Sequence, residues 1–341
     1  MSCGTDDVGH DELDEDNPVV PTPTRLSSIE GIRFSSVSAG YGCTAAVSFA
    51  GTVYTWGTDA YLLGHGDKEG SFVPKQVRAL VGHPILSVSL SLHCLAVTER
   101  GELFSWGYNS CGQCGHGTLG DIEVLPRRAG ALVGVRVRSA SAGDWHSLVV
   151  TEGGALYSFG LDGEMLGRDH VKRTAKDPEI VDALRHVRIV AAAAGAHHSV
   201  ALTEDGRVFT WGDDFGGAFP HEVDALRGLN VRAIAATTDS TCTVTAAGEL
   251  YTWGTDGQFG RLGHGDKTGQ LAPKRVEALR GEWVVAVTCG LHHTIAVTRD
   301  GGVFGWGKAD RLGLPEAAAA VPDDGDCVLT PCRYQQLLCM L

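Results

Sequence analysis

Histidines recur at a fixed place in this sequence, and their spacing bears on whether they take part in catalysis. Each stands thirteen residues before an aromatic residue, and four of them share this offset: His93, His146, His198 and His293. In two further copies of the pattern, Cys43 and Ser240 take the same place. A histidine beside a serine, as in His146-Ser147, has the residue types of a general base and a nucleophile. Because the place recurs in every copy, we instead predict a framework role, such as a hydrogen bond within each structural unit.

The two residues before that place vary from copy to copy, which suits recognition better than framework. The pairs are Tyr41-Gly42, Ser91-Leu92, Asp144-Trp145, Ala196-His197, Thr238-Asp239 and Leu291-His292. A rigid frame with variable residues in its turns is the usual arrangement of a binding surface, and tryptophan is favoured at the centres of interfaces. We predict a partner-binding site made of six residues: Tyr41, Asp144, Trp145, His197, Asp239 and His292. The alternative is that they are solvated turn residues, with Trp145 covering a sheet edge.

Two short motifs have the spacing of cofactor sites but lack the context that such sites require. Residues 115–120, Gly-His-Gly-Thr-Leu-Gly, match the dinucleotide fingerprint, which needs a helix N-terminus facing the pyrophosphate. The run lies in a loop that recurs at Gly64 and Gly263 without the third glycine. Cys111 and Cys114 have the spacing of half a zinc site, but a structural zinc needs four ligands. We expect no cofactor and no metal, and we expect Cys114 to act as a small apolar residue.

Composition and charge limit the classes of partner. The chain has 41 acidic and 28 basic residues and a net charge of −13. Residues 1–24 hold seven acids and no Lys or Arg, so we predict a disordered acidic tail over 1–19 and a folded domain over 20–341. Nucleic-acid binding depends on basic charge, so no direct contact with DNA or RNA is expected.

Location is predicted from what the sequence lacks. No apolar run approaches the roughly 20 residues that cross a membrane, and the first residues do not resemble a signal peptide. The ten cysteines are scattered, as is usual for reduced thiols. We therefore expect no membrane association, and a cytoplasmic or nuclear protein.

All of these residues belong to a repeat that must position them. An aromatic–glycine pair marks six copies: Trp56-Gly57, Trp106-Gly107, Phe159-Gly160, Trp211-Gly212, Trp253-Gly254 and Trp306-Gly307. A glycine stands five residues before each aromatic, between two apolar or alternating runs, which predicts a two-stranded hairpin. A proline followed by apolar residues three and six positions later, as in Pro74-Val77-Leu80, precedes each hairpin and predicts an edge strand. With one further strand before the hairpin, each unit has about four strands.

The repeat resembles the regulator-of-chromosome-condensation repeat. Its best copy reads Tyr-Thr-Trp-Gly at 251–254 and Gly-Arg-Leu-Gly-His-Gly-Asp at 260–266, and the resemblance covers about residues 20–341. It implies an all-β fold, a β-propeller that usually has seven blades around a central axis. In family members that act as guanine-nucleotide exchange factors, acids and a histidine at the variable turns face the small GTPase. Asp144, Asp239 and His292 match those residue types.

The number of blades is left open by the sequence, which holds six complete four-stranded repeats. A seventh unit begins at Pro331-Tyr334-Leu337. Either the ring has six blades and residues 330–337 pair beside the first unit, or it is an incomplete seven-bladed ring, which we favour. In the second case residues 331–341 lack a hairpin to complete them, and their deletion should change stability little.

Three functions are compatible with the resemblance. The first is a protein–protein interaction propeller that acts as a binding module or adaptor. The second is guanine-nucleotide exchange on a small GTPase, in which the propeller stabilises the nucleotide-free GTPase and no covalent catalysis takes place; no inserted hairpin of the kind that exchange factors use is found in the third unit. The third is ultraviolet sensing, as in a plant photoreceptor of this fold, whose repeated Gly-Trp-Arg-His-Thr is approached only at 143–147 and without the arginine. We expect a protein partner, and a small GTPase is one candidate.

Overall fold

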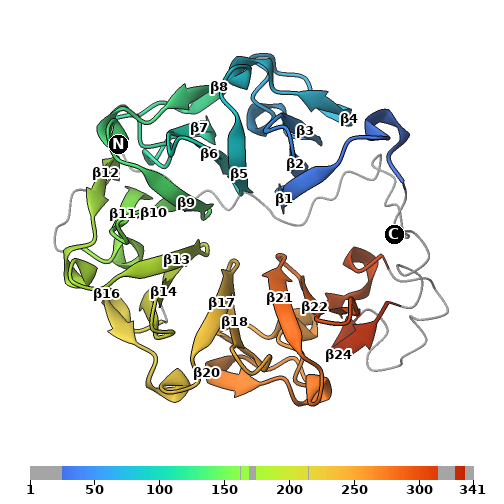
Figure 1. Cartoon of the computed structure of the whole chain (residues 1–341). Helices are drawn as coiled ribbons and strands as arrows, with labels where there is room; N and C mark the ends of the chain where they lie inside the picture. Colours follow the sequence, from blue (N-terminus) through green and yellow to red (C-terminus); the bar gives the residue numbers. More distant parts are fainter. Residues whose placement is uncertain (1–24, 162, 169–173, 214, 314–326, 335–341) are drawn as a thin grey trace.

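The computed structural model describes residues 25–161, 163–168, 174–213, 215–313 and 327–334. Within these ranges twenty-four strands form six antiparallel sheets of four strands each. The sheets are the blades of a six-bladed β-propeller, arranged around a central axis (Figure 1). The all-β propeller predicted from the repeats is therefore confirmed. The predicted tail over residues 1–19 lies outside the described residues.

Each blade runs in sequence order from the central axis to the rim. The innermost strands are β1 (Phe34–Gly40), β5 (Ile85–Leu90), β9 (Val137–Ala142), β13 (Ile189–Ala194), β17 (Val231–Ala236) and β21 (Val284–Cys289). The second strands are β2 (Cys43–Ser48), β6 (His93–Thr98), β10 (His146–Thr151), β14 (His198–Thr203), β18 (Ser240–Thr245) and β22 (His293–Thr298). The third strands are β3 (Val53–Gly57), β7 (Leu103–Tyr108), β11 (Leu156–Leu161), β15 (Val208–Gly212), β19 (Leu250–Gly254) and β23 (Val303–Lys308). The outer strands are β4 (Ser71–Gln76), β8 (Ile122–Arg128), β12 (Thr174–Ile180), β16 (Gly217–Glu222), β20 (Gln270–Arg275) and β24 (Cys327–Arg333).

Short 3-10 helices of three residues connect these strands. One group precedes an innermost strand: η1 (Ser27–Ile29), η3 (Arg78–Leu80), η4 (Gly130–Leu132), η6 (Asp182–Leu184), η7 (Asp224–Leu226) and η9 (Glu277–Leu279). The other group follows a third strand: η2 (Ala60–Leu62), η5 (Glu164–Leu166), η8 (Gln258–Gly260) and η10 (Ala309–Arg311). Within the described ranges, none of these helices has the length and apolar character needed to cross a bilayer.

The two glycines that frame each third strand have different roles, as the fourth blade shows. Gly206 ends the β14–β15 hairpin turn with φ +83°, a backbone conformation that side chains disfavour. Gly212, of the aromatic–glycine pair, lies so near the neighbouring strand that an added Cβ would be 2.4 Å from the carbonyl oxygen of His197. Both glycines predicted from the spacing are therefore required by the hairpin.

The proline elements correct the predicted boundaries of the repeat. Pro74 lies in β4, an outer strand that pairs with β3 of the blade before it, and does not begin the next blade. Pro331 accordingly lies in β24, where Cys332 pairs with Gly305 and Arg333 with Phe304. The segment that was expected to begin a seventh unit at Pro331 instead completes the sixth blade through β24, so that expectation was wrong, and so was the alternative pairing of this segment beside the first unit. Residues 335–341 lie outside the described residues.

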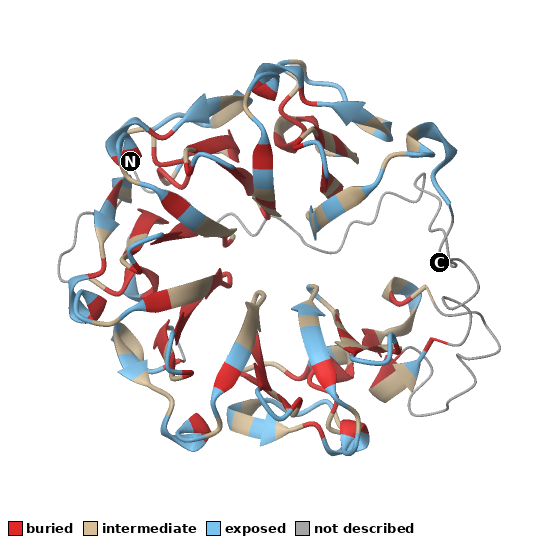
Figure 2. Cartoon of the chain, in the orientation of Figure 1, coloured by how far each residue is buried: buried red, intermediate tan, exposed pale blue. Residues whose placement is uncertain are grey.

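The hydrophobic core is divided into layers between successive blades. Five clusters of buried residues each join two neighbouring blades, from the first and second to the fifth and sixth. Buried residues lie within the ring, and exposed residues gather on the outer strands and loops (Figure 2). Trp106, Trp211 and Trp306 are fully buried in these layers, whereas Trp56 of the first blade is only half-buried. The first and sixth blades are the two ends of this series of packed layers.

Candidate partner-binding site

The six predicted site residues lie on one face of the propeller. Each belongs to the turn between the innermost and second strands of its blade, and these turns all lie at the same end of the strands. The loops that follow the third strands reach the same end, because neighbouring strands in a blade are antiparallel. We call this the turn face. The β2–β3 hairpin turn and its counterparts lie on the opposite face.

Asp144 is the centre of a hydrogen-bond network that joins three blades. The hydroxyl of Tyr41, from the first blade, donates to Asp144 Oδ2 at 2.8 Å. The hydroxyl of Ser91, from the second blade, donates to Asp144 Oδ1 at 2.7 Å. Burial and the charge of Asp144 raise the pKa of Tyr41 well above its usual range. Two predicted residues, Tyr41 and Asp144, are thus brought together, and Ser91 is a partner that the sequence prediction omitted.

Asp239 lies in a second polar group, built around a buried arginine. The guanidinium of Arg261 is 3% exposed, and its NH2 lies 2.9 Å from Asp256 Oδ2 and 3.5 Å from Asp239 Oδ2. Its NH1 donates to the carbonyl oxygen of Leu291 at 2.7 Å, which ties the fifth blade to the turn of the sixth. Burial raises the pKa of Asp239, and the charge of Arg261 opposes this effect.

The two polar groups act on one another electrostatically. The charges of His197 and Asp144 both contribute to the pKa of Asp239, the first lowering it and the second raising it. Five blades therefore contribute to the combined group, through Tyr41, Ser91, Asp144, His197 and Asp239. Sequence reasoning missed Arg261, because it reads there as an ordinary member of the repeated loop.

His292 belongs to an aromatic group between the fifth and sixth blades. Its ring packs edge-on against Phe259, with centroids 4.7 Å apart. The ammonium of Lys308 lies 5.4 Å from the centre of the Phe259 ring, which is within the range of a cation–π contact. Burial lowers the pKa of His292, and Lys308 and Arg261 lower it further, so this imidazole is neutral near pH 7. Phe259 and Lys308 were not predicted; the φ of +60° at Phe259 is not visible in a sequence.

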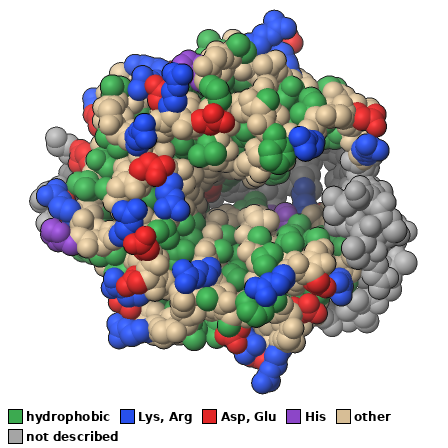
Figure 3. All heavy atoms as spheres, viewed as in Figure 1, with side chains coloured by type: hydrophobic (Ala, Val, Ile, Leu, Met, Phe, Trp, Pro, Cys, Tyr) green, Lys and Arg blue, Asp and Glu red, His purple; other side chains and the backbone are tan. Residues whose placement is uncertain are grey.

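Trp145 follows Asp144 in the same turn and is half-buried. It offers apolar surface next to the Asp144 network, as expected of a residue that contacts a partner. On the face of the molecule that Figure 3 shows, Lys and Arg side chains are interspersed with Asp and Glu side chains around the ring. The face in this view therefore carries both signs of charge.

Three of the four repeated histidines, His93, His146 and His198, form bonds between blades and not within them, which corrects the predicted geometry but confirms their framework role. No such bond is found for His293 among the described residues. His93 Nε2 lies 2.6 Å from Ser147 Oγ, His146 Nε2 lies 2.8 Å from Ser199 Oγ, and His198 Nε2 lies 2.9 Å from Thr241 Oγ1. The hydroxyl of Ser147 donates to the carbonyl oxygen of Gln113 at 2.7 Å. The imidazole of His93 therefore donates to the hydroxyl of Ser147. His146 bonds to Ser199 in the next blade and does not activate the adjacent Ser147.

The two cofactor-like motifs take part in loop structure. Residues 115–120 lie between the strands β7 and β8, so no helix N-terminus follows them. Cys114 is fully buried, as expected of a small apolar residue, and its backbone amide donates a hydrogen bond to Asn109 Oδ1 at 3.0 Å. Among the residues that the structure describes, no group of three or more His, Cys, Asp or Glu side chains is arranged to hold a metal ion.

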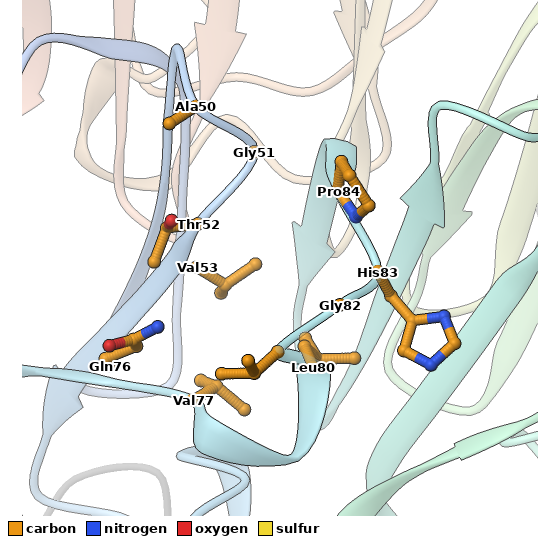
Figure 4. A pocket seen from close by; sticks show the side chains of 11 residues that line it. Ala50, Gly51, Thr52, Val53, Gln76, Val77, Leu80, Gly82, His83 and Pro84 are labelled. Atoms are coloured by element: carbon orange, nitrogen blue, oxygen red, sulfur yellow. The ribbon is translucent and has the colours of Figure 1, made fainter.

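A small pocket lies on the opposite face, between the first and second blades (Figure 4). It holds about 130 Å³ and is lined by the hairpin turn around Gly51 and by the segment from Gln76 to Pro84. Ligand sites are typically roughly 300–1,000 Å³. The amide of Ile85 donates to the carbonyl oxygen of Gly51 at 2.9 Å, so backbone pairing of the repeat shapes this hollow.

The repeat frame can now be compared with known proteins. The model of the RCC1-like domain matches residues 90–336, and that of the regulator of chromosome condensation (RCC1) repeat matches residues 50–97. The chain belongs to the RCC1-like family. Among its curated relatives, the ultraviolet-B receptor UVR8 of Arabidopsis thaliana is 34% identical over 97% of this chain and 67% of its own length. The human E3 ubiquitin-protein ligase HERC2 is 32% identical over 80% of this chain.

This RCC1-like chain spans only 5% of the length of HERC2. Among solved structures, human WBSCR16 has a TM-score of 0.79 and 25% identity, over 93% of this chain and 84% of that one. Prp20p from Saccharomyces cerevisiae has a TM-score of 0.74 and 22% identity, over 89% of this chain and 77% of that one. At these levels of identity, the likeness to Prp20p extends to the fold alone.

Proposed function

We propose that this RCC1-like propeller is a protein-binding module, and that its partner contacts the turn face. The observation that carries the proposal is the network at Asp144, which joins variable turn residues from three blades. Residues held in place before binding lose little entropy when a partner arrives. The aromatic surfaces of Trp145 and Phe259 lie on the same face and supply the kind of contact that interface centres favour.

The proposed site suits a macromolecule better than a small molecule. A standard protein interface buries roughly 800 Å² on each partner, which several turns of a propeller face can provide. The carboxylate of Asp144 accepts bonds from two neutral hydroxyls, those of Tyr41 and Ser91, and no described Lys or Arg side chain forms a salt bridge with it. A basic group on the partner is the natural complement to that charge.

Nucleotide exchange on a small GTPase is the second candidate. Asp144, Asp239 and His292 match the residue types that exchange factors of the family present at these turns, and all three lie on the turn face. The structure of Prp20p is described with its binding properties to Gsp1p and histones, which is a property of that protein. Ultraviolet sensing, the role in the name of UVR8, has less support, because Trp145 is the one tryptophan of this chain in an inner turn.

The test of the proposal compares two tryptophans. Partners are captured on the immobilised full chain and identified, and the affinity of each purified partner is measured. Trp145→Ala should weaken binding at least tenfold if the indole is an interface anchor, since such anchors contribute about 2 kcal/mol or more. The matched control is Trp283→Ala, because Trp283 is 41% exposed and precedes β21 on the opposite face. Equal affinities for the two variants would place the site elsewhere.

The same experiment separates the two candidate functions. If a GTPase is recovered, release of a fluorescent guanine nucleotide is followed with and without the propeller. Accelerated release that is lost in Trp145→Ala supports exchange, whereas binding without acceleration supports the adaptor. Charge reversal at Asp144 is less informative, because it would also break the bonds from Tyr41 and Ser91.

A further inference from the structure

The layer between the fifth and sixth blades contains two thiols in unusually close contact. Cys242 lies in β18 and Cys289 is the last residue of β21. Their sulfur atoms are 2.7 Å apart, closer than unbonded sulfur atoms ordinarily approach. Forming a disulfide bond of about 2.05 Å would need the sulfurs to move together by only about 0.7 Å.

The surroundings of the pair suit a bond that is made after folding. Cys242 is 1% exposed and belongs to the buried cluster of these two blades. Cys289 is only half-buried, because it ends the innermost strand of its blade. A small oxidant can therefore reach Cys289 from the central channel, while Cys242 is held against it from within the core.

The same layer lacks the bridge that joins other blades. Ser240 takes the place of the framework histidine in the fifth blade, and Thr294 occupies the acceptor place in the sixth. The hydroxyl of Thr294 donates to the carbonyl oxygen of Arg261 at 2.8 Å, but no hydrogen bond joins it to Ser240 in this described part of the chain. A covalent link between Cys242 and Cys289 would cross a layer that has no imidazole bridge.

We propose that Cys242 and Cys289 form an intrachain disulfide when the protein meets a hydroperoxide. In the first step the thiolate of Cys289 attacks one oxygen of hydrogen peroxide and the O–O bond breaks. Cys289 becomes a sulfenic acid, and the hydroxide that leaves takes up the proton released by the thiol and becomes one water. In the second step the sulfur of Cys242 attacks the sulfenic sulfur, the S–S bond forms, and a second water leaves. The two thiols lose two electrons and two protons, and hydrogen peroxide is reduced to two waters. This modification site does not depend on the proposed partner-binding site.

The first readout is chemical. The full chain is folded and reduced, treated with hydrogen peroxide, blocked with a maleimide and digested without reductant. The expected result is one cross-linked peptide pair, holding Cys242 and Cys289, with a mass two hydrogens below the sum of the reduced peptides. Separate sulfinic acids at the two sites, or free thiols at both after peroxide treatment, would overturn the proposal.

The second readout is thermal. The disulfide links positions 47 residues apart, which restricts the unfolded chain, so the melting temperature of the oxidised protein should rise by about 5–10 °C over the reduced protein. Cys242→Ser and Cys289→Ser should each abolish this rise. Cys332→Ser is the matched control, since Cys332 is also half-buried in the sixth blade, and it should retain the rise. If the melting temperature of Cys289→Ser still rises on oxidation, other residues cause the rise and the proposed disulfide between Cys242 and Cys289 is refuted.

Discussion

At the scale of single residues, the framework histidines act as connectors between blades. His146 is fully buried, and its Nε2 lies 2.8 Å from Ser199 Oγ in the next blade. We expect His146→Ala to lower the free energy of unfolding by about 2–4 kcal/mol, through a cavity and a lost hydrogen bond. Urea unfolding at pH 7 measures this change. His186→Ala is the control, because His186 is exposed, and it should change stability by less than about 0.5 kcal/mol. Equal stabilities of the two variants would contradict the connector role.

Predictions about single residues were confirmed where the residue recurs at a fixed place in the repeat. The thirteen-residue offset indicated that His93, His146 and His198 are framework residues. It could not indicate that their partners lie in the next blade, because that depends on how two sheets stack. The contact between Tyr41 and Asp144 spans 103 positions and arises only when three blades curve around one axis.

At the scale of the strand, a tryptophan of the third strand anchors the second, fourth and sixth blades to the preceding blade. Trp211 is fully buried, and its Nε1 donates to the carbonyl oxygen of Met165 at 2.8 Å. We expect Trp211→Ala to cost about 3–5 kcal/mol of unfolding free energy. Trp56 holds the same place in the first blade but is half-buried, so Trp56→Ala should cost less by at least about 1 kcal/mol. Chemical unfolding of the two variants side by side tests the difference, and a smaller loss in Trp211→Ala would refute it.

The outer strand of the sixth blade gives a prediction opposite to the one drawn from sequence. Tyr334 is 7% exposed, packs in the cluster of the fifth and sixth blades, and donates its hydroxyl to the carbonyl oxygen of Leu312. Tyr334→Ala should therefore lower the unfolding free energy by about 3–5 kcal/mol, and removing residues 331–341 should lower it at least as much. Tyr334→Phe keeps the ring and should lose only about 1 kcal/mol. An unchanged melting temperature after the deletion would restore the original expectation.

Six blades could be counted from six aromatic–glycine pairs, since each pair marks one hairpin. The place where one blade ends could not be found in the same way. A proline such as Pro74 reads as an edge strand at either end of a unit, because it lacks an amide donor in both cases. Only the pairing of β4 with β3 decides to which blade it belongs.

At the scale of the whole molecule, the buried imidazoles make stability depend on pH. Burial lowers the pKa of His93, His146 and His198 to about 3 each, against an ordinary value of about 6.5. As the pH falls below about 6.5 the unfolded chain takes up protons at these sites, while the folded chain does not until about pH 3. The free energy of unfolding is therefore highest above this window and falls through it, by up to about 4 kcal/mol per pH unit for three protons.

Urea unfolding between pH 7 and pH 5 measures this slope before most carboxylates titrate. His146→Gln removes one of these titrating groups, so its slope should be smaller than that of the wild-type protein by up to about 1.4 kcal/mol per pH unit. A stability that does not change between pH 7 and pH 5 would contradict the burial of neutral imidazoles.

The bonds made by the histidines also give each blade a direction. The third blade, residues 137–180, receives a bond at Ser147 from the blade before it and gives one from His146 to the blade after it. It is thus a head-to-tail building block, whose two sides are chemically different and mutually complementary. A second copy of residues 137–188, which are the blade and its connection to the next innermost strand, inserted directly after the first would meet its twin with Ser147 facing His146. Every donor would still find an acceptor, so an architecture of this kind can lengthen by duplication of whole blades without inventing a new contact.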